Sequence, residues 1–220
     1  VFALTFVGRA GAQSVPPPAT QYSFDPNGVE VISGAIFIQS PAIAIGQPGM
    51  GGLTYQRTYD SNIQDWRDNV SSGINLENSI YTVTLFGSSE TFTLSGGVFS
   101  SNEEQGGTLT YNSTTQIYTY TTSSGAIAVY DKALAGGQPT QANEGRATTV
   151  TLPTGEVFTF TYTTLTASGF LAQRLQSLTN TLGYQLNFRY ASNTADATGI
   201  TLVEVMGLNN AIDYCAPASN

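Results

Sequence analysis

The side chains that most enzyme mechanisms require are missing from this sequence. Its 220 residues contain no histidine, a single cysteine and a single lysine, Lys132. Without histidine, neither a Ser-His-Asp nor a Cys-His arrangement can form, and one cysteine cannot supply the ligands of a zinc site. No glycine-rich loop ends in Lys-Ser or Lys-Thr, which excludes a phosphate-binding P-loop. We therefore expect a protein that is not an enzyme and that uses no cofactor.

Carboxylates are concentrated around residue 65, where a calcium site has to be considered. The stretch Asp60-Ser-Asn-Ile-Gln64 opens like a calcium-binding loop, but its sixth and twelfth positions are Asp65 and Ser71 instead of Gly and Glu. A calcium site of another kind, built from Asp60, Asp65 and Asp68, is the alternative to a solvated connection. We favour the solvated connection, so no metal is predicted.

Trp66 is the only tryptophan, and two opposite charges, Asp65 and Arg67, flank it. The apolar face of an indole can stack on a sugar ring while neighbouring charges bind the hydroxyl groups of the sugar. The interpretation that we favour is structural: the indole anchors an irregular segment, Ser61 to Ser72, on a sheet. Glycan stacking by Trp66 is the alternative.

The charge of the chain limits its partners. Seven basic and 15 acidic residues give a net charge of −8, and only 10% of all residues are charged. Such an acidic chain repels phosphate backbones and anionic membranes, so we expect no nucleic-acid partner. The 12 Tyr, 11 Phe and 1 Trp provide apolar surface for a folded core, which a disordered acidic chain lacks.

The N-terminal residues have the features of the second half of a secretory signal peptide. Val1 to Val7 form a short apolar run, and Ala10-Gly-Ala12 fits a small-x-small cleavage site. We interpret residues 1–12 as a residual signal peptide and 13–20 as a Pro-rich spacer, which predicts export. The apolar run is too short for a membrane span, which needs about 20 residues.

Cys215 is the lone cysteine of a chain that we expect to be exported. In an oxidising compartment its thiol is either free or paired with a cysteine outside this sequence. The sequence offers no histidine that could activate it as a nucleophile. We favour a disulfide with a further cysteine downstream.

Hydrophobic residues alternate with a period of two along most of the chain, which indicates half-buried β-strands. The clearest cases are Ile80 to Phe86, Ile117 to Thr122, Val157 to Tyr162 and Leu186 to Tyr190. The leucines between Phe170 and Leu178 also fit one face of a helix, but we favour a strand because the surrounding pattern is β.

Short turn motifs rich in Gly, Asn, Pro and Ser separate these strands. They are Gly87 to Ser89, Gly96-Gly97, Ser123 to Gly125, Pro153 to Gly155, Asn180 to Gly183 and Asn209-Asn210. Two connections are predicted to be longer, Gly46 to Gly52 and Ala135 to Gly145. Because short connections join antiparallel neighbours, we predict an all-β fold, an antiparallel meander of β-hairpins in a twisted sheet.

A weak internal repeat appears when the glycines are aligned. Two glycines, 28 residues apart, are each followed at +5 and +7 by aromatic residues: Gly155 by Phe160 and Tyr162, and Gly183 by Phe188 and Tyr190. Looser copies begin at Gly87, Gly125 and Asn209. Each unit predicts a glycine turn with positive φ and a return strand whose alternate aromatic side chains face one side.

These units resemble the YD repeat of bacterial RHS proteins, in which a Gly precedes an alternating aromatic pair. The preceding segments Arg146 to Leu152 and Arg174 to Asn180 look like the RL-x-S-V-T strand that leads into each repeat. Further upstream, Gly51 to Ser61 (GGLTYQRTYDS) looks like the GGL-x-L-x-R-x-Y-x-S strand that precedes the repeats in this family. The copies are degenerate, because Tyr130 is the only repeat-end tyrosine that Asp follows.

The resemblance covers residues 24–215 and suggests a division of the chain. We expect a β lead-in region at 21–107 and truncated, degenerate YD-type β-hairpin repeats at 108–220. Membership of the family would imply that these repeats begin a hollow β-shell. In many bacterial members such a shell encloses a C-terminal toxin.

The resemblance implies a non-catalytic structural role outside the cell. The chain would be a segment of an exported RHS/YD-repeat protein, located extracellularly or on the surface of a bacterium. Its partner would be the remainder of the same chain, shell and C-terminal effector included. The alternative is a cell-surface module that binds carbohydrate or a neighbouring cell through exposed aromatic side chains. The sequence identifies neither cargo nor ligand.

Overall fold

The computed structural model describes residues 25–31, 34–47, 51–104, 106–135, 143–167, 170–191 and 202–213, with the backbone alone for 165–167 and 170–172. Within these ranges the regular structure consists of β-strands and one short 3-10 turn, η1 (Lys132–Leu134). The all-β prediction is therefore confirmed. The predicted signal peptide, the Pro-rich spacer and Cys215 lie outside the described residues.

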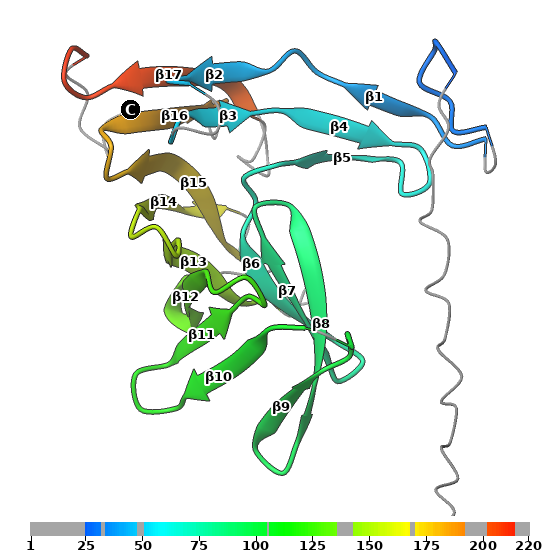
Figure 1. Cartoon of the computed structure of the whole chain (residues 1–220), viewed down its shortest axis with the longest axis vertical. Helices are drawn as coiled ribbons and strands as arrows, with labels where there is room; N and C mark the ends of the chain where they lie inside the picture. Colours follow the sequence, from blue (N-terminus) through cyan, green and yellow to red (C-terminus); the bar gives the residue numbers. More distant parts are fainter. Residues whose placement is uncertain are drawn as a thin grey trace, which may run out of the picture.

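The strands are short in the N-terminal half and longer in the C-terminal half (Figure 1). They are β1 (Phe37–Gln39), β2 (Ile43–Ile45), β3 (Leu53–Tyr55), β4 (Arg57–Asp60), β5 (Asp65–Asp68), β6 (Gly73–Glu77), β7 (Ile80–Leu85), β8 (Ser88–Ser95), β9 (Val98–Ser101), β10 (Thr108–Asn112), β11 (Ile117–Thr121), β12 (Ile127–Asp131), β13 (Asn143–Thr151), β14 (Val157–Ala167), β15 (Phe170–Asn180), β16 (Tyr184–Tyr190) and β17 (Leu202–Asn209).

Three sequence interpretations can be compared directly with these bounds. The segment with leucines at helical spacing is strand β15, as we favoured. The segment 61–72 is only partly irregular, because its residues 65–68 form β5, which pairs with β4 and places Trp66 opposite Tyr59. The predicted connection 135–145 extends too far, since its last residues, from Asn143 onward, already belong to β13 and pair with β6.

The first strands form a long ribbon that ends against the C-terminal strands. β1 pairs with β4, and β2 pairs with β3, so the two pairs follow one another along a single interrupted hairpin. The backbone N–H of Ser40 donates to the carbonyl of Arg57 at the interruption, which keeps the two halves together. At one end of the ribbon, β2 and β3 pack against β16 and β17 (Figure 1). A side chain at Gly207 of β17 would crowd Ile45 of β2, so glycine permits this close approach.

The large sheet divides at β13. One edge of β13 pairs with β12 along residues 146–151. The other edge pairs with β6 at Asn143 to Arg146 and with β14 at Thr149 to Thr151. From this point β14 to β17 continue in one direction, and β6 to β9 continue in another. Two different walls therefore diverge from a single strand (Figure 1).

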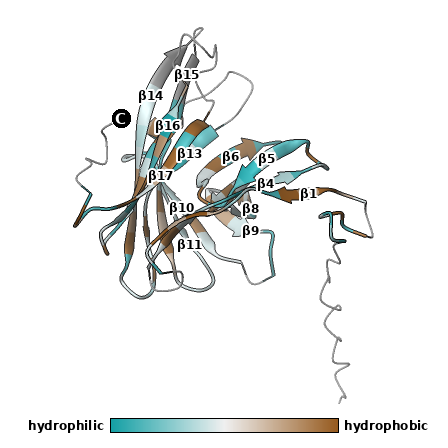
Figure 2. Ribbon diagram, turned by 90° about the horizontal axis from the view of Figure 1, so that it is seen from above, coloured by the Kyte–Doolittle hydropathy of each residue, from teal (hydrophilic) through white to brown (hydrophobic). Residues whose placement is uncertain are grey.

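The core extends from the inside of the curl made by β6 to β13 to side chains of β3, β14, β15 and β16. β9 comes to lie beside β10 without a described strand pairing between them. Along β11 and β12 the buried residues stand at alternate positions, which is the period-two pattern of the sequence, and apolar and polar residues are interspersed along the ribbon (Figure 2). The Tyr130 ring is fully buried, and its hydroxyl donates to the Thr84 carbonyl at 3.0 Å, which satisfies the polar end of a core aromatic side chain.

Three hairpin turns of the large sheet share one backbone structure. In each, the N–H of a glycine with positive φ donates to the carbonyl three residues earlier: Gly125 to Thr122, Gly155 to Leu152 and Gly183 to Asn180. This is a type I turn followed by a left-handed residue, a common three-residue hairpin loop. The turn at Gly87 is different, because Phe86 and Gly87 both have positive φ in a two-residue loop.

Glu90 of β8 connects the strands of the curl on the side where β9 and β10 do not pair. Its carboxylate accepts hydrogen bonds from the Gly107 N–H, the Ser101 hydroxyl and the Tyr120 hydroxyl, at 2.6 to 2.8 Å. Burial raises the pKa of Glu90, but the hydrogen bonds from Ser101, Tyr120 and Gly107 outweigh it, so the pKa is lowered from the ordinary 4.5. One charged group thus connects β8 with the beginning of β10 and with β11.

We predict that Glu90→Gln lowers the free energy of unfolding by about 1–2 kcal/mol at pH 7, since part of the charge-assisted bonding is lost and solvent screens the rest. Because the folded-state pKa of Glu90 is depressed, its contribution is complete above pH 4.5 and disappears as the pH falls through the lower folded-state value. Urea unfolding at pH 7 and at pH 3 should show the difference between the two proteins shrinking at the lower pH.

The matched control is Glu103→Gln, which removes a carboxylate from an exposed turn nearby. Its unfolding midpoint should equal that of the parent chain at both pH values. A loss as large as that of Glu90→Gln would mean that net charge, not the local bonding, governs stability.

Candidate functional site

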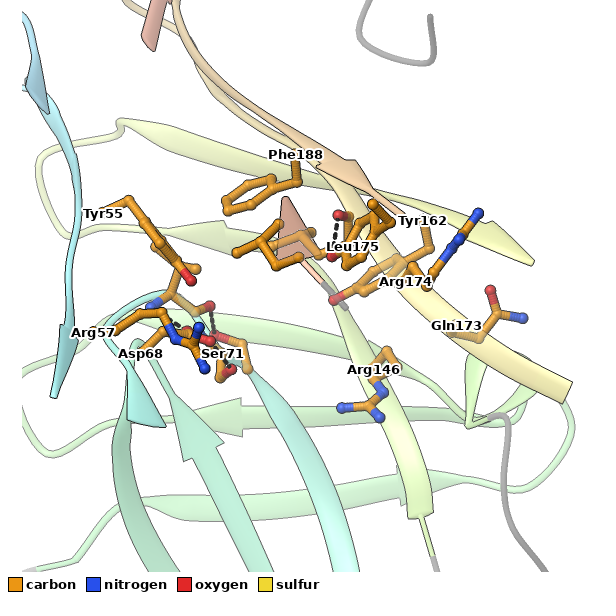
Figure 3. A pocket seen from close by; sticks show the side chains of 14 residues that line it. Tyr55, Arg57, Asp68, Ser71, Arg146, Tyr162, Gln173, Arg174, Leu175 and Phe188 are labelled. Carbon is orange, nitrogen blue, oxygen red and sulfur yellow. Dashed lines mark hydrogen bonds between the residues drawn. The ribbon is translucent and has the colours of Figure 1, made fainter. Parts of the chain in front are cut away.

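A cavity of about 260 Å³ lies where β6 and β14 diverge from the edge of β13. Its walls come from β3, β4 and β5 on one side and from β13 to β17 on the other. Figure 3 shows Arg57 and Asp68 on the first side, and Arg146, Tyr162 and Arg174 on the second. The cavity exists because β14 extends beyond its short pairing with β13, so no strand fills the angle between the two walls.

Positive charge is concentrated at this cavity. Three arginines line it, Arg57, Arg146 and Arg174, together with one carboxylate, Asp68, so the lining carries a net charge of +2. Residues 25–213 contain only six Lys or Arg residues, which means that half of them surround one cavity. Because the whole chain has a net charge of −8, the cavity is a positively charged region in a negatively charged protein.

Arg146 extends from β13 close to the start of β6. A terminal nitrogen of its guanidinium would lie within 3.4 Å of a side chain at Gly73, so the small residue leaves room for the arginine. The Nε atom of Arg146 is buried and has no hydrogen-bond partner. Burial raises the pKa of the neighbouring Tyr162 above its ordinary 10.0, while Arg146 acts in the opposite direction. The Tyr162 hydroxyl is therefore protonated at neutral pH.

Arg57 and Asp68 face each other across the β4–β5 pair. The guanidinium carbon of Arg57 lies 5.2 Å from the centre of the Trp66 ring, a cation–π contact. Both oxygens of Asp68 accept hydrogen bonds from the turn that follows, from the N–H groups of Val70 and Ser71 and from the Ser71 hydroxyl. Asp68 is thus used mainly to hold its own turn.

The tyrosines of the cavity keep their protons. Burial, with a smaller effect of Asp68, raises the pKa of Tyr55 to about 12, and Arg57 opposes the shift. Burial also raises the pKa of Tyr190, whose hydroxyl donates to the Leu175 carbonyl at 2.8 Å. The guanidinium carbon of Arg174 lies 5.0 Å from the centre of the Tyr190 ring. Cations and aromatic rings are therefore both present in the wall of the cavity.

The repeat residues have two different positions in the structure. The glycines, Gly155 and Gly183, form equivalent hairpin turns. The +5 residues, Phe160 and Phe188, belong to the apolar core with 5% and 2% of their surface exposed. The +7 residues, Tyr162 and Tyr190, line the cavity, and of the +5 residues Phe188 also contributes to its lining.

We assigned no binding role to the arginines from the sequence, although a signal for two of them is present. Arg146 and Arg174 stand nine residues before the repeat glycines and are 28 residues apart, the same spacing as the glycines. Each lies near the start of the strand that resembles the RL-x-S-V-T segment. Successive units of a repeat place equivalent residues side by side, so the spacing predicts neighbours. Arg57 comes from a distant part of the chain, and no spacing in the sequence indicates that it lies near Arg146 and Arg174.

The carboxylates that we considered for calcium do not converge. Asp60 and Asp65 each accept a hydrogen bond from a backbone N–H close by in sequence, and Asp68 holds the next turn. Within the part of the chain that the structure describes, no three His, Cys, Asp or Glu side chains are grouped to hold a metal ion.

Trp66 lies on the face of a small sheet. Its ring packs against Tyr59 with a centroid distance of 5.5 Å, and 39% of its surface is exposed. Since Arg57 lies over the same indole, Trp66 supports a residue of the cavity from outside. Glycan stacking by Trp66 stays a prediction.

Comparisons with known proteins give no assignment. The chain matches no known protein family, and no curated protein shows significant similarity to it. Across the described ranges, the structure contains no helix long and apolar enough to cross a membrane.

We predict that Trp66→Ala lowers the free energy of unfolding by about 1–2 kcal/mol, because the indole is partly exposed and packs on one ring and one guanidinium. Phe92→Ala should cost about 3–5 kcal/mol, since Phe92 is fully buried in the core. Urea denaturation of both variants measures the difference. Equal losses would show that Trp66 is an essential anchor.

Proposed function

We propose that this chain is a non-catalytic structural segment of an exported bacterial RHS/YD-repeat protein. Its hairpins would form part of a β-shell that encloses or presents a C-terminal effector. The observation that carries the proposal is the series of equivalent hairpins, whose turns at Gly125, Gly155 and Gly183 are spaced by 30 and 28 residues. Each unit adds two antiparallel strands to the same sheet.

The end of the sheet supports this proposal. β17 is the last strand of the large sheet, and no described strand pairs with its outer edge. Val203 on β17 has 66% of its surface exposed. An unpaired edge strand is a template for further pairing, and in a repeat protein the next unit provides that strand. Successive hairpins of this kind would extend the wall as a shell requires.

The proposal can be tested by hydrogen exchange on the chain and on a longer product of the same gene that includes the codons after Asn220. Additional hairpins should pair with β17, so outward-facing amides between Leu202 and Asn209 should exchange at least tenfold more slowly in the longer protein. The amides of β7, which already has two neighbours, serve as the internal control. Unchanged exchange in β17 would contradict the shell proposal.

A cell-surface carbohydrate-binding or adhesion module is the second candidate function, and the cavity favours it. Cations and aromatic rings along one concave site are suited to a polar ligand with apolar faces. This function does not exclude the first, because a shell segment can carry a binding site.

Binding to a glycan array tests the second function. We expect the parent chain to bind at least one class of glycan, and Trp66→Ala to weaken this binding at least fivefold, because the indole supports Arg57 or contacts the sugar itself. Phe99→Leu is a control for loss of an aromatic ring outside the cavity. Absence of binding by a folded parent chain would favour the structural function alone.

A further inference from the structure

We propose that the cavity at the β13 fork, lined by Arg57, Arg146 and Arg174, is a binding site for a monosaccharide-sized acidic sugar whose carboxylate lies between Arg57 and Arg146. This inference deepens the second candidate function and does not depend on the shell. The ligand class is a pyranose with a single carboxylate, such as a hexuronic acid. Its binding would be non-covalent.

The first argument is the charge of the cavity. The lining has a net charge of +2 in a chain whose net charge is −8. The one acidic lining residue, Asp68, already accepts hydrogen bonds from its own turn with both oxygens. Because Asp68 is held in this way, it is not a bidentate partner for an arginine of the cavity. Even without Arg174, the charges of Arg57 and Arg146 exceed that of Asp68 by one, and this surplus is available to an anion.

The second argument is the unsatisfied donor of Arg146. Its Nε–H is buried and has no hydrogen-bond partner, and folded proteins rarely leave such a group unpaired. The two ion pairs that connect described residues, Lys132–Glu144 and Arg189–Glu204, involve neither Arg146 nor Arg57. A carboxylate matches the planar fork of a guanidinium with two parallel hydrogen bonds, one of which can use Nε–H.

The third argument concerns the rest of the ligand. Tyr55, Tyr162 and Tyr190 line the same cavity, and raised pKa values keep their hydroxyl groups protonated. Aromatic faces pack against the C–H faces of a pyranose, while tyrosine hydroxyls can bond its hydroxyl groups. These rings distinguish the cavity from a site for a bare inorganic anion.

The size and charge of the ligand are limited as well. A volume of about 260 Å³ lies just below the usual range for small-molecule pockets, which begins at about 300 Å³. The net charge of −8 disfavours a polyanion such as a nucleic acid or a polyphosphate more strongly than a ligand with one charge. A single acidic sugar residue, free or at the end of a chain, satisfies both limits.

The test is a titration of the 220-residue chain with glucuronate, glucose and sulfate by isothermal calorimetry at low ionic strength. We expect saturable binding of glucuronate and at least tenfold weaker binding of glucose, which has the same ring without the carboxylate. Sulfate should bind at least tenfold more weakly than glucuronate, because it cannot use the aromatic wall. Equal binding of glucose or of sulfate would overturn the proposal, as would the absence of saturable glucuronate binding.

Variants locate the site. Arg146→Gln and Arg57→Gln should each weaken glucuronate binding at least tenfold, the expected effect of losing a charge-assisted hydrogen bond. Arg189→Gln is the matched control, because it changes the net charge equally but removes a surface ion pair with Glu204 outside the cavity. We expect its affinity to stay within twofold of the parent value.

Circular dichroism and thermal unfolding establish that each variant is folded before titration. If Arg146→Gln does not fold, Arg57→Gln on the opposite wall carries the same test. Equal weakening by Arg189→Gln would show a general charge effect and overturn the proposed site. Failure of glucuronate binding would leave the hydrogen-exchange result on β17 unaffected, so the two proposals fail independently.

Discussion

The branching of the large sheet at β13 is the constraint on which the other features depend. A strand has two edges, and β13 uses one for β12 and divides the other between β6 and β14. Backbone hydrogen bonds in this small region therefore fix the angle between the two walls. Since a branch cannot be closed by backbone pairing, side chains must fill it. The arginines and tyrosines of the cavity occupy this angle, and the apolar core, which fills the curl and also includes Phe160 and Phe188, adjoins it.

Hydrogen bonds between carboxylates and tyrosine hydroxyls connect strands that backbone hydrogen bonds do not pair. The curl of β6 to β13 is held at its unpaired side by Glu90, which reaches Gly107 and Tyr120. Glu144 of β13 has a similar role, since it accepts a hydrogen bond from Tyr118 and forms an ion pair with Lys132 at 2.5 Å. The raised pKa of Tyr118, caused mainly by burial and then by the hydrogen bond to Glu144, keeps that hydroxyl a donor. Tyrosine thus combines an apolar body with a polar end.

The hairpin repeat connects the architecture with the candidate site. The residue five positions after each repeat glycine is buried in the core, and the residue seven positions after it reaches the cavity, which Phe188 also lines. The two positions lie on the same side of the strand by alternation, and the bulge between Arg189 and Tyr190 and the one near Tyr162 alter the local direction of the strands. A periodic sequence can in this way build a site from equivalent residues without any catalytic motif.

The sequence alone determined the β-structure, the hairpin turns and the alternation of buried aromatic residues, because these depend on period-two patterning and on glycines with positive φ. It also predicted that β15 is a strand and indicated, through the 28-residue spacing, that Arg146 and Arg174 are equivalent. Only the tertiary structure determined that the sheet branches at β13 and that Arg57 and Trp66 lie beside this branch. Pairing between strands distant in the chain depends on which edges remain unpaired after local hairpins form, and no local pattern records that choice.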